Sequence, residues 1–536
     1  MKNPTKKVRV LLQPKHFLAY KPLLLSILTA FASPLVFADD AANTNEATNK
    51  APVTKIELPS VAVTGNPLGL SSDELVVPVT VLNGRELSLK RESTLGDTLD
   101  GMPGVSATHY GPNASRPIIR GLDGERVRIM QNGVGIVDAS SLSFDHAVAV
   151  DPLVIEQIDV VRGPAALLYG GSAVGGVVNA IDHRIPTEKL DGVTGRAEAR
   201  LGGPDSQSNV AGVVDAGNGQ LAIHADAYSR KSNDLSIPGF AVSSRKSAAD
   251  GTPRTNNGTL INSNATGDGG AIGASLTFDN GYLGASYSGF NSNYGTVADD
   301  AVHIDMKSQR WDIASEFTDL GSIINRVKVR MAYTDYVHKE IDTTTGEIGT
   351  TFKNKGVEGS IEASHAKISL TNNLQLNGVV GVQFQNTTFE ALGVEAFVPS
   401  TNTQSKALYA YEELPIDQLK LSFGGRVEHT SVDSGDNATF GPAQNRSFNP
   451  NSYALGGLYT VDSHWSIASN LSHNERAPSY FELYANGPHL ATGQFEIGNT
   501  NFGKERSNGI DAQIRWKDGK NSFSAGPYYT RFSSFI

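Results

Sequence analysis

The chain has 536 residues, of which 39% are hydrophobic, and it carries a formal net charge of −10 at pH 7. This length exceeds one ordinary hydrophobic core, and the lack of any run of 18 apolar residues excludes a membrane protein built from helices. The acidic balance argues against a nucleic-acid partner, and the lack of cysteine excludes thiolate metal sites.

Residues 1–38 have the pattern of a secretory signal peptide. Basic residues precede an apolar stretch from Leu23 to Phe37, and Val36-Phe37-Ala38 fits a cleavage site. Removal of this segment deletes six basic and no acidic residues, which changes the formal net charge from −10 to −16. That charge is compatible with cationic cargo, and a solvated acidic surface explains it equally well.

Residues 39–64 are predicted to be a flexible tether, because the polar tract after Asp39 has too few apolar residues to fold alone. The tether ends in a β-prone segment, Leu58-Pro59-Ser60-Val61-Ala62-Val63-Thr64. Such a segment can add as a strand to the sheet edge of a partner. It could equally be the first strand of the next domain.

Residues 65–188 are predicted to form a mixed α/β domain with short apolar runs. A helix is expected to start at the Ser93-Thr94 cap and to continue through residues 95–100. Gly101 and Pro103 should end it.

Residues 189–536 change to a period of two, which is typical of strands with one apolar and one polar face. The segment Leu419–Glu428 is an example, with Leu421, Phe423 and Val427 on its apolar face. Hairpin signals recur at Asp279–Gly281, Asp319–Gly321 and Lys517–Lys520. Longer polar segments are expected as loops at 231–268, 291–305, 338–353, 391–404 and 476–505. Short turns at one end and long loops at the other are typical of an outer-membrane β-barrel.

The number of strands in this region is about fifteen by the alternation pattern, which is an odd number. A barrel in lipid must close on itself to satisfy its backbone hydrogen-bonding groups. We therefore expect the sequence to be incomplete at its C-terminus.

Two segments, Pro117–Gly133 and Val154–Ala180, closely resemble the plug of TonB-dependent receptors. The resemblance is carried by the motif residues Arg120, Gly121, Arg162, Gly163, Pro164, Tyr169 and Gly170. The glycines of 170–176 lack the Lys-Ser/Thr ending of a phosphate-binding loop, so nucleotide binding is disfavoured.

The resemblance implies a transmembrane β-barrel of 22 strands with an N-terminal plug domain, located in the outer membrane of a Gram-negative cell. It also implies a receptor that imports a scarce nutrient as a metal ion or metal chelate, without enzymatic activity or an organic cofactor. The TonB–ExbB–ExbD complex would act on a TonB box at Leu58–Thr64.

Within this superfamily the chain looks most like the ZnuD-type zinc receptors. The matching stretches are Ser140–Ala147, Asp335–Glu340 and Glu475–Glu496. We therefore expect Zn²⁺ as transported cargo, bound by imidazole and carboxylate groups. The candidate ligands are Asp145, His146, His338, Glu340 and His489, with His109, His303 and Glu482 as secondary candidates.

The period of two gives an independent test of this assignment. In Arg326–His338 the odd positions are apolar and should face lipid, so His338 and Glu340 should share the lumen side. By the same argument His473 faces lipid or the rim, which excludes it as a ligand.

Two other functions stay open on the sequence. A haem or iron-siderophore receptor of the same fold could use the stretch around Arg476 and His489. A passive porin or a surface adhesin would share the barrel but would need neither a plug nor a TonB box.

Overall fold

The computed structural model describes residues 68, 71 and 73–536, except for residues 164, 165, 298, 372, 395, 490, 491 and 520. The described residues belong to one compact unit. The predicted signal peptide (1–38), tether (39–64) and TonB box at Leu58–Thr64 lie outside the described residues.

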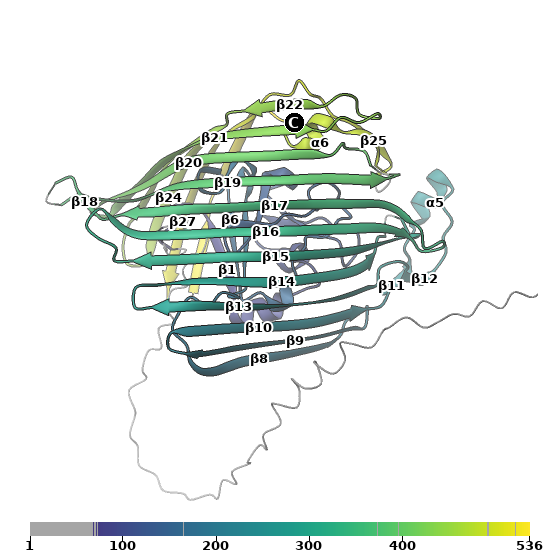
Figure 1. Cartoon of the computed structure of the whole chain (residues 1–536), viewed down its shortest axis with the longest axis horizontal. Helices are drawn as coiled ribbons and strands as arrows, with labels where there is room; N and C mark the ends of the chain where they lie inside the picture. Colours follow the sequence, from purple (N-terminus) through teal and green to yellow (C-terminus); the bar gives the residue numbers. More distant parts are fainter. Residues whose placement is uncertain are drawn as a thin grey trace, which may run out of the picture. The chain divides into compact units, whose positions relative to one another are not determined.

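A large antiparallel sheet forms the wall of a barrel around a smaller domain (Figure 1). Its longer strands are β8 (Asp191–Gly202), β9 (Gln207–Asn218), β10 (Leu221–Ser232), β13 (Ala265–Phe278), β14 (Gly281–Gly295), β15 (Val302–Thr318), β16 (Ile324–Asp342), β17 (Ile348–His365), β19 (Gln375–Gly393), β20 (Thr401–Ile416), β21 (Leu419–Ser434), β23 (Asn451–Thr460), β24 (Trp465–Arg476), β27 (Glu505–Asp518) and β29 (Tyr528–Ser534). Three short strands, β18 (Ile368–Ser369), β22 (Gln444–Phe448) and β28 (Asn521–Ala525), pair with β19, β21 and β27 beside the longer ones.

The described residues thus form fifteen long strands, which agrees with the odd number expected from the alternation pattern. The 22 strands implied by the resemblance are not confirmed. The strand order nevertheless returns from β29 to β8, a closure that the alternation pattern did not predict. Because neighbouring strands are antiparallel, an odd number brings β8 and β29 to this seam in the same direction. Both strands are exposed along most of their length.

The outer face of the barrel is apolar, as the period of two predicts. On β16 the even positions from Arg330 to Glu340 are buried, whereas Tyr333 is 43% exposed. Exposed apolar side chains recur around the wall: Val193, Leu201, Ile223, Ile272, Leu283, Trp311, Val382, Leu408, Val427, Leu455, Ile467 and Ile510. Among the described residues, no helix is long and apolar enough to cross a membrane.

Short turns and long loops lie at opposite ends of the strands. The turns at Asp279, Asp319 and Gly519 fall where the hairpin signals predicted them. The longest connections carry β11 (Leu235–Phe240), α5 (Ser244–Asp250), β12 (Asn257–Leu260), α6 (Tyr480–Tyr484), β25 (Asn486–His489) and β26 (Gln494–Ile497).

The predicted loop at 338–353 was wrong in its bounds. β16 extends to Asp342 and β17 begins at Ile348, so His338 and Glu340 lie in regular strand. A tall barrel wall accommodates polar strand residues beyond the lipid, because their backbone groups stay paired in the ladder.

The domain inside the barrel is a five-stranded sheet with strand order β1-β6-β7-β4-β5 and short helices on it. Its elements are β1 (Val79–Asn83), α2 (Gly84–Lys90), α3 (Leu95–Leu99), β2 (Val105–Ala107), β3 (Pro117–Ile119), η1 (Gly124–Arg126), β4 (Val127–Gln131), β5 (Val134–Gly135), η2 (Pro152–Val154), β6 (Gln157–Arg162), α4 (Ala166–Tyr169), η3 (Gly171–Ala173) and β7 (Gly176–Ile181). The predicted helix start is confirmed, since the Thr94 side chain accepts a hydrogen bond from the Asp97 N–H.

The core of this inner domain is apolar. Leu82, Leu99, Ile119, Ile158 and Val178 are fully buried in one cluster. Strands β6 and β7 are buried on both faces, because one face meets this core and the other packs against Met130, Tyr169 and Ala173 of the same domain.

Ion pairs join the inner domain to the barrel wall. They are Arg91–Glu198, Arg120–Asp511, Arg126–Glu505, Arg128–Glu358 and Arg184–Asp226. A guanidinium and a carboxylate that lose water together are stable only when paired, so each pair holds the inner domain in one position.

The first described residues of the inner domain lie at the end of the barrel that carries the short turns. Lys420 donates to the Glu74 carbonyl oxygen, and Arg515 donates to that of Leu75 at 2.6 Å.

The Arg-Gly-Pro turn of the sequence motif lies at one of these ion pairs. Gly163 has φ +83°, and a Cβ atom there would lie 2.8 Å from Arg120 Nη1 and 3.0 Å from Asp511 Oδ2. The Arg120–Asp511 pair spans 2.6 Å, so a side chain at Gly163 has to push the two groups apart. This contact explains why the turn contains glycine.

We expect Gly163→Ala to destabilise the inner domain more than Gly101→Ala. Gly101 also has positive φ (+74°) but open space around it, so both variants cost about 1–2 kcal/mol for the left-handed backbone. Only Gly163→Ala also disturbs a buried ion pair. Hydrogen exchange of the β6 amides measures the difference, and equal protection in the two variants would contradict the role of the contact.

Candidate metal centre

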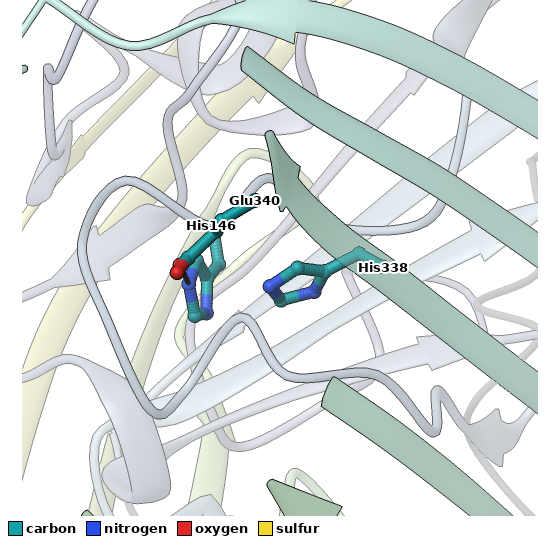
Figure 2. A group of neighbouring side chains, drawn as sticks. All are labelled: His146, His338 and Glu340. Carbon is teal, nitrogen blue, oxygen red and sulfur yellow. Dashed lines mark hydrogen bonds and ion pairs between the residues drawn. The ribbon is translucent and has the colours of Figure 1, made fainter. Parts of the chain in front are cut away.

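One group of side chains in the described residues has the composition and spacing of a metal site: His146, His338 and Glu340. Their candidate ligand atoms all lie within 4.8 Å of one another. Figure 2 shows the His338 imidazole pointing toward that of His146, with the two rings edge to face and the Glu340 carboxylate beside His146. All three residues are buried.

His146 comes from the inner domain, on the loop between β5 and η2. Asp138 closes this loop by accepting a hydrogen bond from the Ala149 N–H. Tyr294 of β14 holds its tip, because its hydroxyl donates to the Asp145 carbonyl oxygen at 3.0 Å and accepts from the Ala147 N–H at 2.8 Å. The barrel wall therefore fixes where the loop presents its histidine.

The imidazole of His146 has a defined orientation. Its Nδ1 lies 3.1 Å from the Ala139 carbonyl oxygen, which can only accept, so Nδ1 carries a proton. Its Nε2 points to Glu340 Oε1 at 3.3 Å and to Asp145 Oδ1 at 3.9 Å. A backbone acceptor on one nitrogen is the usual way in which proteins leave the other nitrogen for a metal.

Burial lowers the pKa of His146, but the Asp145 carboxylate and the hydrogen bond to Glu340 outweigh burial and raise that pKa to about 9. Without a metal, His146 is therefore an imidazolium at neutral pH, and its positive charge lies where a cation would bind. A metal ion that binds Nε2 has to displace this proton.

His338 and Glu340 come from β16, and both face the lumen as the period of two predicted. The Tyr336 hydroxyl lies 2.7 Å from His338 Nδ1. Nε2 of His338 is buried and has no hydrogen-bond partner among the described residues. When Nδ1 donates its proton to Tyr336, Nε2 is unprotonated and offers a lone pair. Because no described residue donates a hydrogen bond to this buried nitrogen, it is available to a metal ion.

The two other predicted ligands lie beside this group. Asp145 is buried and accepts a hydrogen bond from the Ser143 hydroxyl. His489 is also buried, but its Nε2 contacts Ser143 Oγ at 2.7 Å and its Nδ1 contacts Glu496 Oε1 at 2.6 Å. Asp145 is therefore placed to become a fourth ligand, whereas His489 reaches the group only through Ser143.

The secondary candidates lie elsewhere. His303 contacts Asn293, Glu482 pairs with Arg476, and the His109 side chain is 62% exposed beside Asp97. His473 lies on the outward side of β24 and stacks on exposed Tyr453, as predicted.

The plug-motif residues serve structure and not the site. Arg120 and Gly163 meet Asp511, as described above, and Arg162 donates to Thr80 Oγ1. Gly121 and Gly170 have positive φ. Tyr169 is buried with Val161 and Val177, and Pro164 lies outside the described residues.

Sequence reasoning missed several residues that support the group. Tyr336 shares the lumen side with His338 and could have been found by the same alternation. Phe352 lies directly opposite His338 in the β16–β17 register, and its ring centroid is 4.7 Å from that of His338. Glu496 and Ser143 fix His489. No sequence signal gives the strand register or the contact between two distant loops.

Two imidazoles and one or two carboxylates form a ligand set for Zn²⁺ or another borderline divalent metal ion. Ca²⁺ and Mg²⁺ prefer oxygen ligands throughout and are disfavoured. Neighbouring ligand atoms around tetrahedral Zn²⁺ lie about 3.4 Å apart. The 3.3 Å between His146 Nε2 and Glu340 Oε1 already fits, and the other separations have to shorten by at most about 1.4 Å.

Comparison with known families gives two matches that together cover most of the described chain. Residues 71–177 match the TonB-dependent Receptor Plug Domain. Residues 239–536 match the family TonB dependent receptor-like, beta-barrel.

Two curated relatives are similar in sequence. The vitamin B12 transporter BtuB of Photobacterium profundum is 24% identical over 430 residues, which are 79% of this chain and 63% of that protein. The hemin receptor of Yersinia pestis is 32% identical over 154 residues, or 28% of this chain and 22% of that protein. The chain thus spans less than two thirds of the length of either relative.

The fold is also that of known structures. The copper transporter OprC superposes with a TM-score of 0.68 at 15% identity, over 85% of this chain and 71% of that one. At this identity the likeness shows the fold alone.

We expect Zn²⁺ binding to release about one proton at pH 7, because the pKa of His146 lies near 9 without metal. The apparent affinity should therefore rise about tenfold per pH unit between pH 6 and 8 and level off above pH 9. Calorimetry in buffers of different ionisation enthalpy measures the proton count. A binding enthalpy that does not depend on the buffer would contradict the assignment of His146 as a ligand.

Proposed function

The chain belongs to the TonB-dependent receptor family, and on this basis we propose that it imports Zn²⁺ across the outer membrane. The TonB complex would supply the energy by acting on Leu58–Thr64. Zn²⁺ would be the cargo, and His146, His338 and Glu340 would bind it, with Asp145 as a fourth ligand.

The observation that carries this proposal is the position of the His146–His338–Glu340 group. One ligand belongs to the inner domain and two belong to the barrel wall, at the end of β16 remote from the short turns. A movement of the inner domain against the wall would separate the ligands. A site of this kind binds tightly at rest and releases its ion when the inner domain is pulled.

The charge of the group also supports a divalent cation. At neutral pH two carboxylates, Asp145 and Glu340, surround the His146 imidazolium. When Zn²⁺ replaces the imidazolium proton, the buried positive charge rises from one to two. It then equals the negative charge of the two carboxylates. Burial of unpaired charge is thereby avoided.

Copper is a competitor on chemical grounds, since Cu²⁺ binds imidazole ligands more tightly than Zn²⁺ does. The resemblance to ZnuD-type zinc receptors favours zinc. Selectivity would then depend on geometry and on which ion is available.

Haem or a ferric chelate is the alternative cargo, because hemin receptors are among the similar proteins. A haem iron would need a free imidazole near the entrance, and His489 is the candidate. Both nitrogens of His489 are occupied, and its ring stacks on Phe397 with centroids 4.9 Å apart. Haem binding at His489 would therefore require the loop to open.

We expect the double variant His146→Ala/His338→Ala to lose Zn²⁺ affinity by more than about 100-fold, because loss of an outer-sphere partner alone costs 10- to 100-fold. Calorimetry on the purified receptor measures the affinity. The matched control is His429→Ala/His473→Ala, which removes two barrel histidines that contact Asn449 and Asn508. Heat-modifiable migration in both double variants would verify that the barrel is folded.

Retained Zn²⁺ affinity in the first double variant would refute the site. Tight haem binding by the unchanged receptor, without Zn²⁺ binding, would favour the alternative cargo.

We expect Val61→Pro to abolish energised uptake while cargo binding stays unchanged. Strand addition to a partner requires backbone N–H donors, which proline lacks. Uptake of radioactive zinc by cells measures the effect, with Val61→Ala as the control. Full uptake by Val61→Pro would point to a passive pore.

A further inference from the structure

A polar cavity of about 230 Å³ lies next to the metal centre, between the inner domain and the barrel wall. Its wall on the barrel side comes from β17, β19, β20, β21 and the segment 476–480 at the end of β24, and includes Asn354, Glu358, Gln383, Thr403, Ser405 and Glu428. On the side of the inner domain it is lined by residues such as Arg128, Asp138, Ser140 and Tyr169.

The segment Asp138–Ser141 separates this cavity from the metal centre. On one side the Ala139 carbonyl oxygen accepts the hydrogen bond from His146 Nδ1. On the other side the Asp138 carbonyl oxygen accepts from Asn354 Nδ2 at 2.6 Å, and Asn354 lines the cavity. The metal centre and the cavity therefore lie on opposite sides of this one backbone segment.

The cavity offers a cation side-chain oxygen atoms and no imidazole among its described lining residues. The Asn354 Oδ1 atom is buried and has no hydrogen-bond partner among the described residues. Four arginines and four acidic residues line the cavity, and two of the acidic residues are paired in Arg128–Glu358 and Arg426–Glu428. A nearly neutral polar wall cannot strip water from a divalent cation, but it can hold the hydrated ion weakly.

The volume fits such an ion. On this measure of cavity volume each water needs about 10–15 Å³, so the six waters of a hydrated divalent cation need about 60–90 Å³. The cavity of about 230 Å³ accommodates it without displacement of the ion pairs in its wall.

We propose that this cavity is a transit station that receives the hydrated divalent cation from the His146–His338–Glu340 site. The inference rests on the proposed import of Zn²⁺. Displacement of Asp138–Ser141 would break the Ala139 hydrogen bond that orients His146, and it would open the way to the cavity in the same movement. The same displacement then releases the ion from the metal centre and gives it access to the cavity.

The absence of cysteine from the chain allows a direct test, because an introduced thiol is unique. Ser405 lines the cavity, whereas its neighbour Gln404 is exposed on the opposite side of β20. We compare Ser405→Cys and Gln404→Cys before and after reaction with a small cationic methanethiosulfonate, and mass spectrometry verifies labelling.

Labelled Ser405→Cys should take up zinc at least tenfold more slowly than the unlabelled variant, with unchanged Zn²⁺ affinity in calorimetry. Labelled Gln404→Cys should be unaffected in both measurements. If the reagent does not reach Ser405→Cys, Ser405→Trp fills the cavity without labelling and should give the same loss, with Gln404→Trp as its control.

Normal uptake by labelled Ser405→Cys, or by folded Ser405→Trp, would overturn the transit station and leave the zinc proposal intact. Failure of the proposed function has a different signature, since the unchanged receptor would then bind no Zn²⁺.

Discussion

The structure depends on one constraint: every strand of the barrel must offer lipid an apolar face and still satisfy its backbone in the ladder. Alternation along the strands then leaves the lumen with polar and charged side chains. A domain that fills such a lumen cannot pack there by apolar contact alone. It is held by charged pairs such as Arg120–Asp511 and Arg184–Asp226, together with apolar clusters such as that of Leu153 and Val154 with Tyr228.

This mode of packing has a consequence for motion. Separation of an apolar interface costs free energy in proportion to the apolar area that becomes exposed to water. A buried ion pair instead resists separation until its two groups have moved apart and water can enter. A boundary of discrete pairs holds the inner domain firmly at rest. One end of this boundary carries Asp73 and Leu75, which Lys517 and Arg515 of the barrel contact.

The metal centre uses the same boundary. Its ligands are divided between the loop of His146 and the strand of His338 and Glu340, and the loop is pinned by Tyr294 from a third place on the wall. The centre is therefore assembled only when the inner domain is seated. The imidazolium of His146 lies between the acidic side chains of Asp145 and Glu340, so that buried groups of opposite charge offset one another.

The amino-acid sequence was sufficient to predict the two-part architecture, the odd number of strands and the side of each strand that faces the lumen. These properties follow from local periodicity, because alternation along a strand assigns each side chain to one face. His338 and Glu340 are placed on the lumen side and His473 on the outside by this argument alone, and the barrel has them there. The family motifs added the inner domain and its turns.

Which of these residues meet was decided by the tertiary structure. The register that sets Phe352 against His338, the hydrogen bond from His146 to Ala139, and the contact of His489 with Ser143 instead of the metal group all depend on how the chain packs. Alternation gives a side chain its face but not its height or its neighbour. Those are set by strand register and by the way in which charged pairs seat one domain inside the other.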